Sequence, residues 1–244
     1  METNFRKTNL ENIESATIVN ERSLFASVFT WMFLALAITS VVSVLFANVP
    51  ALDALLYSEN QFGQLKLSIF AWVCMFAPLG LVLVMNFAFN KLSFITLMAI
   101  FFGYAALNGI SFSTIFHVYS LGSIGAVFAS TCALFGLMAV AGYTTKTDLT
   151  KLGSLLMIAL IGVVVASLIN FFMHSDTMSY IISIASVIIF TGLTAYDVQK
   201  IKELAQTSDG SQDFKKMGVM GALRLYLDFI NLFLSLLRLF GKRD

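Results

Sequence analysis

The sequence predicts an all-α integral membrane protein with seven transmembrane helices. Of its 244 residues, 58% are apolar and 12% are charged, and its mean hydropathy is +0.85, whereas soluble proteins are about half apolar and about a quarter charged. So much apolar surface needs lipid as its solvent. Seven apolar runs are also long enough to cross roughly 30 Å of hydrocarbon as helices, and they are continuous rather than alternating, which argues against a β-barrel.

The expected helices follow one another along the chain. They cover residues 24–48, 67–89, 93–116, 121–143, 153–173, 179–200 and 219–240. The two long connections, residues 49–66 and 201–218, are polar, and we expect both to be mobile loops. In the fourth run, Gly125, Ala129 and Ala133 recur at four-residue spacing, which predicts a face that packs closely on another helix.

The chain divides into three parts by composition. Residues 1–22 form a polar amino-terminal arm of mixed charge, which does not resemble a cleavable signal peptide. Residues 23–241 form a single membrane domain of seven helices, and residues 242–244 form a tail. The remaining segments are too short to fold separately.

Basic residues predict a cytoplasmic amino terminus. With that terminus inside, ten basic residues lie in cytoplasmic segments, against Lys66 alone in the three external loops, as the positive-inside rule requires. The ten are Arg6, Lys7, Arg22, Lys91, Lys146, Lys151, Lys200, Lys202, Lys215 and Lys216. Seven spans place the carboxyl terminus outside, where Arg238, Lys242 and Arg243 are inconsistent with the rule. Either this basic tail is tolerated outside, or the final segment is a re-entrant or half-buried helix that ends inside.

Composition excludes several functions. The net charge is +1, and no cluster of Lys and Arg is interleaved with aromatic residues, so we expect no nucleic-acid binding. We also expect no cofactor, because clustered His and Cys ligands and glycine-rich phosphate loops are missing from the sequence. The expected partner is the lipid bilayer.

Two aspartates are the candidate functional site. Of fourteen acidic residues, only Asp197 and Asp228 fall at membrane depth, near the end of the sixth run and roughly two turns into the seventh. The chain reverses between them, so both lie in the cytoplasmic half and could face each other. An ionisable side chain at such depth costs several kcal/mol unless it is paired or hydrated, which marks it as functional by default.

A purely structural interpretation remains open for each aspartate. Arg224 precedes Asp228 by four residues and Asn231 follows it by three, so Asp228 could be satisfied within its own helix. Asp197 has Lys200 one turn ahead and could reach water from its shallow position. Two carboxyl groups at matching depth on consecutive helices favour a functional pair.

A close aspartate pair would respond to protons. Two carboxylates in a low-dielectric site cannot both ionise cheaply, so we expect Asp197 and Asp228 to share one proton. Protonated, the pair would hold its helices together; ionised, the charges would repel and attract a cation such as Ca²⁺. Tight Ca²⁺ binding needs six to eight oxygen ligands, so two carboxyl groups suit only a weak, transient site on a leak path.

Intramembrane aspartyl proteolysis is the one enzyme class that these residues suggest. Such proteases also use aspartates on their sixth and seventh spans. Their Gly-x-Gly-Asp signature is missing here, because Leu225, Tyr226 and Leu227 precede Asp228. We therefore expect the protein not to be an enzyme.

Several segments resemble bacterial members of the Bax inhibitor-1 family. The similar stretches are FAPLGLV (76–82), LNGISFSTIFHVY (107–119), GYTTKTDL (142–149), LTAYDVQKIK (193–202) and LYLDFINLFLSLLRLFG (225–241). The resemblance implies six helices around a central seventh and a pH-sensitive Ca²⁺ leak, with the family's aspartate pair at Asp197 and Asp228. Some members also have basic residues after the second span that latch onto the sixth-span aspartate; only Lys91 remains here, which leaves that latch in doubt.

The sequence therefore leaves two functions to consider. The first is a pH-sensitive Ca²⁺ or cation leak channel or exchanger of the bacterial inner membrane, with Ca²⁺ and protons as its ions. The second is a membrane protein that transports nothing and modulates a partner, since some relatives are thought to act on a membrane-bound AAA protease.

Overall fold

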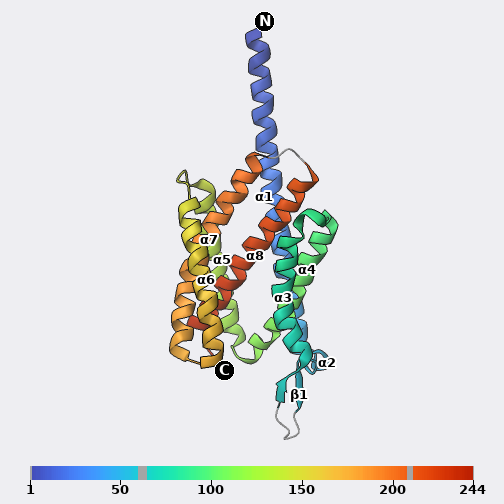
Figure 1. Ribbon diagram of the computed structural model, residues 1–244, viewed down its shortest axis with the longest axis vertical. Helices are drawn as coiled ribbons and strands as arrows, with labels where there is room; N and C mark the ends of the chain where they lie inside the picture. The colour runs from blue at the N-terminus through green and yellow to red at the C-terminus, as the bar shows by residue number, and fades with distance from the viewer. Residues whose placement is uncertain (1, 60–64, 208–210, 244) are drawn as a thin grey trace.

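The protein is a bundle of long helices (Figure 1). The structure is a computed structural model that describes residues 2–59, 65–207 and 211–243, with the side chains of 2–21, 59 and 65 excepted. The long helices are α1 Glu2–Asn48, α3 Ile69–Phe87, α4 Phe94–Phe112, α5 Leu121–Thr144, α6 Thr150–Met173, α7 Asp176–Gln206 and α8 Gln212–Phe240. All seven are long and apolar enough to span a membrane. The predicted all-α membrane fold is confirmed.

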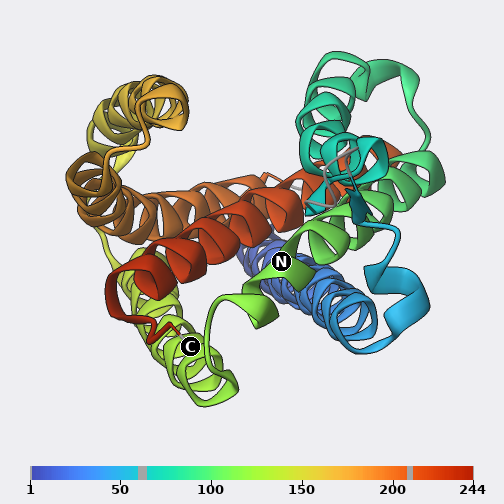
Figure 2. The same ribbon diagram turned by 90° about the horizontal axis from the view of Figure 1, so that it is seen from below.

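Helix α8 occupies the centre of the bundle. In its most apolar window 72% of the residues are buried, against 44% in α7 and 11% in α6. It packs against α7, α1, α5 and α4, while α3 packs mainly on α4 and α6 mainly on α7. Seen along the bundle, α8 runs between the other helices (Figure 2). This is the central seventh helix that the resemblance implied.

The described residues of the two connections predicted to be long loops contain regular secondary structure. Residues 49–66 contain helix α2 (Pro50–Asp53) and most of an antiparallel hairpin of β1 (Tyr57–Glu59) and β2 (Leu65–Leu67). The predicted loop 201–218 is wrong by several turns, because α7 continues to Gln206 and α8 begins at Gln212. Hydropathy locates the edge of the hydrocarbon layer, and these polar helical turns extend beyond it. Ser211 then caps α8 by accepting a hydrogen bond from the Phe214 amide.

The small residues of the fourth span do not pack as predicted. Gly125, Ala129 and Ala133 are exposed on α5. A methyl group added at Gly125 would meet nothing within 4 Å. The close approach of α5 to its neighbour occurs instead at Gly142, where a methyl group would overlap the Ala195 carbonyl of α7. The prediction of close packing at this spacing is therefore wrong, because these residues lie on an exposed face of α5.

The carboxyl-terminal tail lies at the opposite end of the bundle from the start of α1 (Figure 1). The Lys242 amide donates to Ser123 Oγ (2.8 Å), the Ser120 amide donates to the Lys242 carbonyl (3.2 Å), and Tyr119 forms a β-bridge with Arg243. These contacts fasten the tail to the 3-10 turn η2 (Ser113–His117) and the start of α5. Helix α8 therefore crosses the bundle, and the re-entrant alternative does not describe this structure.

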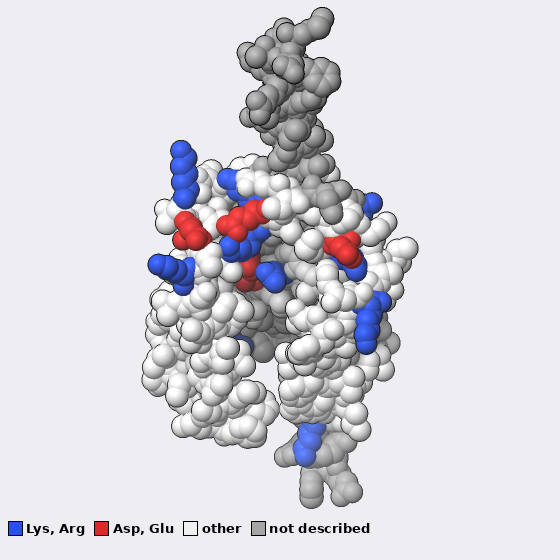
Figure 3. Space-filling model, turned by 45° about the horizontal axis from the view of Figure 1, so that its top comes forward, with Lys and Arg blue, Asp and Glu red and all other residues white. Residues whose placement is uncertain are grey.

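Charged side chains gather at the end of the bundle from which the amino-terminal part of α1 projects (Figure 3). This end carries the connection between α5 and α6 and the connection between α7 and α8. The predicted arm of residues 1–22 is continuous with the first span in α1 from Glu2 onward, and its side chains before Arg22 lie outside the described residues. Its cytoplasmic location stays a prediction.

Candidate functional site

Asp197 and Asp228 are both buried where α7 packs against α8. The residues are 8% and 4% exposed, respectively. Helices α7 and α8 form the most extensive helix pair of the bundle. The structure thus brings together two carboxyl groups that are 31 residues apart in the sequence, in an environment dominated by apolar side chains.

The two carboxyl groups lie within hydrogen-bonding contact of each other. When both are ionised they are acceptors only, and Asp228 Oδ2 is then a buried oxygen without a hydrogen-bond donor among the described residues. A proton held by either carboxyl group changes this, because a carboxylic acid can donate to the neighbouring carboxylate. A proton shared between the two carboxyl groups would supply a hydrogen bond inside the buried pair.

Close helix contacts fix the position of Asp197. On α5, Gly142 lies directly against the backbone of Ala195, and on α6, Gly153 lies against the ring of Tyr196. A larger side chain at Gly142 would push the α7 backbone away, and one at Gly153 would displace the Tyr196 ring. The two residues immediately before Asp197 are thus held by two neighbouring helices, which limits how far its carboxyl group can move without a rearrangement of the bundle.

A second polar cluster lies next to the pair on the other side of α8. The Tyr226 hydroxyl and Thr39 Oγ1 of α1 are 2.7 Å apart, and Thr39 also donates toward the carbonyls of Ala35 (3.0 Å) and Ala105 (2.9 Å). Tyr226 is fully buried and contacts the rings of Phe101 and Tyr104 edge-on. Sequence reasoning missed this cluster, because a tyrosine and a threonine inside apolar runs give no distinctive signal.

Arg224 is near the pair but forms no close ion pair with it. Its guanidinium attracts both carboxylates electrostatically, yet the ion pairs of 4.0 Å or less in the described part of the chain join other residues. Asn231 Nδ2 donates to the Leu227 carbonyl of its own helix at 2.8 Å. The interpretation of Asp228 as a side chain satisfied within its own helix is therefore wrong.

The lysines considered for Asp197 have other neighbours. Lys200 pairs with Glu203 at 2.6 Å and lies over the Tyr196 ring. Lys91 is an exposed residue at the end of the 3-10 turn η1 (Phe89–Lys91), and no ion pair with Asp197 is found among the described residues. The missing basic latch is therefore not replaced by Lys91 in this structure.

Gln199 is a further buried polar residue close to the site. Its Oε1 accepts a hydrogen bond from the Leu149 amide (2.8 Å), and its Nε2 donates to the Thr147 carbonyl (2.9 Å). These two bonds join α7, two residues after Asp197, to the connection between α5 and α6. The position of Gln199 two residues after Asp197, on the same predicted helix, was the signal in the sequence that could have found it.

The pair can hold and release a proton, but it offers few ligands for a metal. Across the described ranges no group of three or more His, Cys, Asp or Glu side chains is placed to hold a metal ion. Two carboxyl groups supply up to four oxygens, fewer than the six to eight of a tight Ca²⁺ site. Any cation attracted to the ionised pair would need water for most of its coordination shell.

Comparison with known proteins connects this site to a family. The sequence model of the family described as inhibitor of apoptosis-promoting Bax1 matches residues 21–244. The inner membrane protein YbhL of Escherichia coli strain K12 is 41% identical over 224 residues, which cover 91% of this chain and 92% of YbhL. An uncharacterized protein of Borreliella burgdorferi is 41% identical over 231 residues, covering 94% of this chain and 96% of that protein.

A third relative matches over a shorter range. An uncharacterized membrane protein of Streptococcus pyogenes serotype M3 is 50% identical over 147 residues, which cover 60% of this chain and 64% of that protein. The names of the Escherichia coli and Streptococcus pyogenes relatives describe membrane proteins, and none of the three names describes an enzyme.

Proposed function

The chain belongs to the Bax inhibitor-1 family, and from this membership and its buried aspartate pair we propose that it is a pH-sensitive leak channel or exchanger for Ca²⁺ or a related cation in the bacterial inner membrane. The membrane is that named for the relative YbhL. Asp197 and Asp228 are its proton-sensing residues and a weak, transient cation site. The observation that supports the proposal is that these two carboxyl groups lie in contact in a buried site, where a buried Asp228 oxygen has no hydrogen-bond partner among the described residues.

Protonation sets whether α7 and α8 attract or repel. With one proton, the carboxyl groups are joined by a hydrogen bond across the two helices, and such charge-assisted bonds are among the strongest in proteins. Without it, two negative charges face each other in an apolar environment and repel strongly. Because α8 is the central helix, a separation at this point would open the middle of the bundle on the side where charged residues gather (Figure 3).

The test is Ca²⁺ flux in liposomes that contain the purified protein, measured across neutral pH. The variants are Asp197→Asn and Asp228→Asn. Each new amide can donate to the remaining carboxylate at every pH, so we expect low flux without pH dependence. Asp176→Asn is the matched control, since Asp176 is an exposed aspartate at the start of the same α7 helix, and it should behave as the parent. The parent pH profile in both pair variants would refute the proposal.

The alternative is a membrane protein that modulates a partner such as a membrane-bound AAA protease. The projection of α1 beyond the bundle favours it, because this stretch of helix extends past the other membrane-spanning helices (Figure 1). Co-purification with a protease complex, together with zero flux in liposomes for the parent protein, would establish this function instead. Removal of residues 2–21 should then abolish co-purification.

A further inference from the structure

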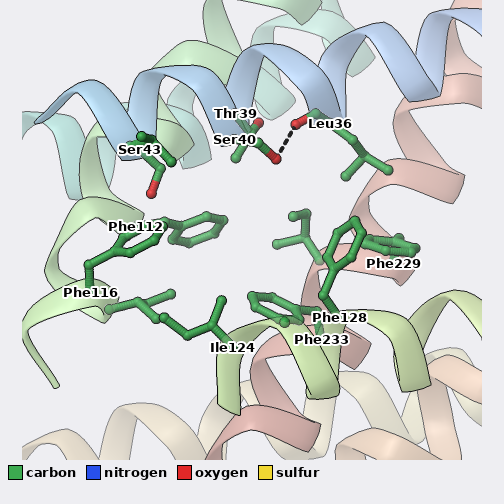
Figure 4. Close-up of a pocket in the computed structure, with 14 residues that line it drawn as sticks. Leu36, Thr39, Ser40, Ser43, Phe112, Phe116, Ile124, Phe128, Phe229 and Phe233 are labelled. Atoms are coloured by element: carbon green, nitrogen blue, oxygen red, sulfur yellow. Dashed lines mark hydrogen bonds between the residues drawn. The ribbon is translucent and has the colours of Figure 1, made fainter. Parts of the chain in front are cut away.

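A cavity of about 230 Å³ lies in the half of the bundle that contains the carboxyl-terminal tail. It is bounded by α1, the end of α4, η2, α5 and α8 (Figure 4). Its walls are mainly aromatic and aliphatic, with Phe112, Phe116, Phe128, Phe229 and Phe233 among them. The aspartate pair does not line it, so the cavity is a feature separate from the proton-sensing site.

The mouth of this cavity faces lipid. Val44 of α1 and Phe128 of α5 line it and are 45% and 40% exposed, and Ser40 and Gly125 beside them are also exposed. All four lie within membrane-spanning segments. A lining residue that is exposed at this depth contacts lipid rather than water, so the opening between α1 and α5 leads sideways into the bilayer.

One hydroxyl inside the cavity lacks a partner. Ser43 is 4% exposed, and its Oγ has no hydrogen-bond partner among the described residues. Figure 4 shows this oxygen directed into the cavity, whereas Ser40, three residues earlier, donates to the Leu36 carbonyl of its own helix at 2.9 Å. A buried hydroxyl is normally satisfied, so the occupant of the cavity should carry a hydrogen-bond acceptor.

The depth of Ser43 suggests which acceptor this is. Ser43 is five residues before the end of α1 at Asn48, a distance of about 8 Å at 1.5 Å per residue. The ester carbonyls of phospholipids lie near the boundary of the hydrocarbon layer. The span Arg22–Asn48 of α1 has 27 residues, or about 40 Å of helix, and exceeds the roughly 30 Å of hydrocarbon, so the boundary lies before the end of α1 and close to the height of Ser43. An ester carbonyl is therefore the acceptor expected at this height.

Positive charge lies close to the mouth. Lys242 and Arg243 are exposed, and Lys242 is fastened to Ser123, which is adjacent to the cavity-lining residue Ile124. Arg243 lies over the Tyr119 ring. Neither basic side chain forms an ion pair of 4.0 Å or less with a described carboxylate, so both are available to a phosphate, which basic side chains bind at membrane surfaces.

We propose that this cavity binds an acyl chain of an anionic phospholipid from the leaflet on the carboxyl-terminal side. The chain enters between α1 and α5, its ester carbonyl accepts a hydrogen bond from Ser43, and its phosphate lies near Lys242 and Arg243. An acyl chain that moves from the bilayer into the cavity exchanges one apolar environment for another, so the hydrophobic effect contributes little to the free energy of binding. Selection therefore depends on shape, the hydroxyl and the headgroup charge.

The first test fills the cavity from its mouth. The protein is reconstituted in nanodiscs with phosphatidylglycerol that carries a photoreactive group on its acyl chain, and labelled peptides are mapped by mass spectrometry. Gly125→Phe should enter open space and reduce labelling of residues 36–44 and 124–128 by at least about threefold, a modest factor because no hydrophobic transfer is lost. Gly136→Phe is the matched control, since Gly136 is an exposed glycine on the same helix, also with open space and away from the cavity.

The second test concerns the headgroup. In the parent, photoreactive phosphatidylglycerol should label these segments more strongly than phosphatidylcholine with the same chain, and the double variant Lys242→Ala and Arg243→Ala should remove the difference. Lys66→Ala is the control for a basic residue at the same end of the molecule. Equal labelling in Gly125→Phe, Gly136→Phe and parent would overturn the proposal. Equal labelling of the parent by phosphatidylglycerol and phosphatidylcholine would also overturn it.

Discussion

Tyr226 is the largest fully buried side chain of the protein, and its hydroxyl is the only polar atom that this side chain places in the centre of the bundle. It meets Thr39 Oγ1 at 2.7 Å. Thr39 keeps two carbonyl acceptors on α1 and α4 whether or not Tyr226 is present. The hydroxyl pair therefore joins α8 to α1, while the threonine itself remains satisfied without it.

Removal of this hydroxyl should cost little stability. Tyr226→Phe deletes one hydrogen bond and leaves no unsatisfied group on Thr39, so we expect a loss of about 0.6–1 kcal/mol, the usual value for such bonds between membrane helices. Unfolding by denaturing detergent measures it. Tyr180→Phe is the control, because Tyr180 is 57% exposed on α7 and should have no effect. A loss several times larger would mean that the hydroxyl supports more than this one bond.

The aspartates were the part of the site that the sequence could predict, and their neighbours were not. A carboxyl group in an apolar run is visible without a structure, because the run itself shows that the group lies at membrane depth, where it is costly unless paired or hydrated. Whether Arg224 or Lys200 neutralises it depends on side-chain direction, and both proved to be without a close ion pair to the aspartates. The Thr39–Tyr226 contact joins residues 187 positions apart, which spacing along the chain does not reveal.

At the scale of helices, glycine contacts decide which helices approach. Gly142 lets α5 lie directly against the α7 backbone at Ala195, two residues before Asp197. Gly136, on the same helix, meets open space instead. The two positions are chemically identical in the sequence and differ only in what faces them.

The pair of glycines gives a direct prediction. Gly142→Ala should force α5 and α7 apart and destabilise the bundle by about 1–3 kcal/mol, the range for overpacked interiors. It should also alter the pH profile of flux, because the backbone before Asp197 moves. Gly136→Ala should do neither. Unfolding in denaturing detergent and the liposome assay measure the two effects, and equal behaviour of both variants would contradict this account of helix contact.

Helix α6 begins next to a carboxyl group outside the membrane-spanning segments. Asp148 Oδ1 accepts a hydrogen bond from the Thr150 amide at 2.8 Å. The bonds from Thr150 lower the pKa of Asp148 below its ordinary value of 3.8. Because the pKa of Asp148 is lower in the folded state, its charged form stabilises the fold. This stabilisation is complete above the pKa of Asp148 in the unfolded chain and is lost as the pH falls through its pKa in the folded protein.

Asp148→Ala should therefore make the start of α6 exchange its amide hydrogens faster at neutral pH. The difference from the parent should shrink as the solution is acidified below the ordinary aspartate range. Asp148→Asn retains an oxygen acceptor, so it should protect the helix start at all pH values. Hydrogen exchange of residues 150–152, followed by mass spectrometry, is the measurement. A pH-independent difference between Asp148→Ala and the parent would show that the charge has no part in it.

The helices themselves were predicted well from hydropathy, since the thickness of the hydrocarbon layer sets the length of each apolar run. The errors lie where the chain leaves that layer. Polar turns at the end of α7 and the start of α8 continue as helix because backbone hydrogen bonds and the Ser211 cap satisfy them. The hairpin of β1 and β2 depends on pairing between residues 57–59 and 65–67, which a short polar connection does not indicate.

At the scale of the whole molecule, the basic residues at the two ends of the bundle favour opposite orientations of the protein in the membrane. Basic residues gather at the end where α1 projects (Figure 3), which predicts that this end is cytoplasmic. Arg238, Lys242 and Arg243 lie toward the other end, where the tail is fastened to Tyr119 and Ser123. A positively charged tail on the external side is compatible with the proposed anionic lipid there, since the lipid phosphate would compensate its charge.

Cysteine labelling tests this orientation directly. In a background with Cys74→Ser and Cys132→Ser, the variants Lys66→Cys and Arg243→Cys should react with a membrane-impermeant maleimide in intact spheroplasts, because the hairpin and the tail share the external side. Lys146→Cys, in the connection between α5 and α6, should react only after the membrane is permeabilised. If Arg243→Cys instead behaves like Lys146→Cys, α8 does not cross the membrane as described here. The basic tail would then obey the positive-inside rule, and the proposed lipid site would lose its headgroup contacts.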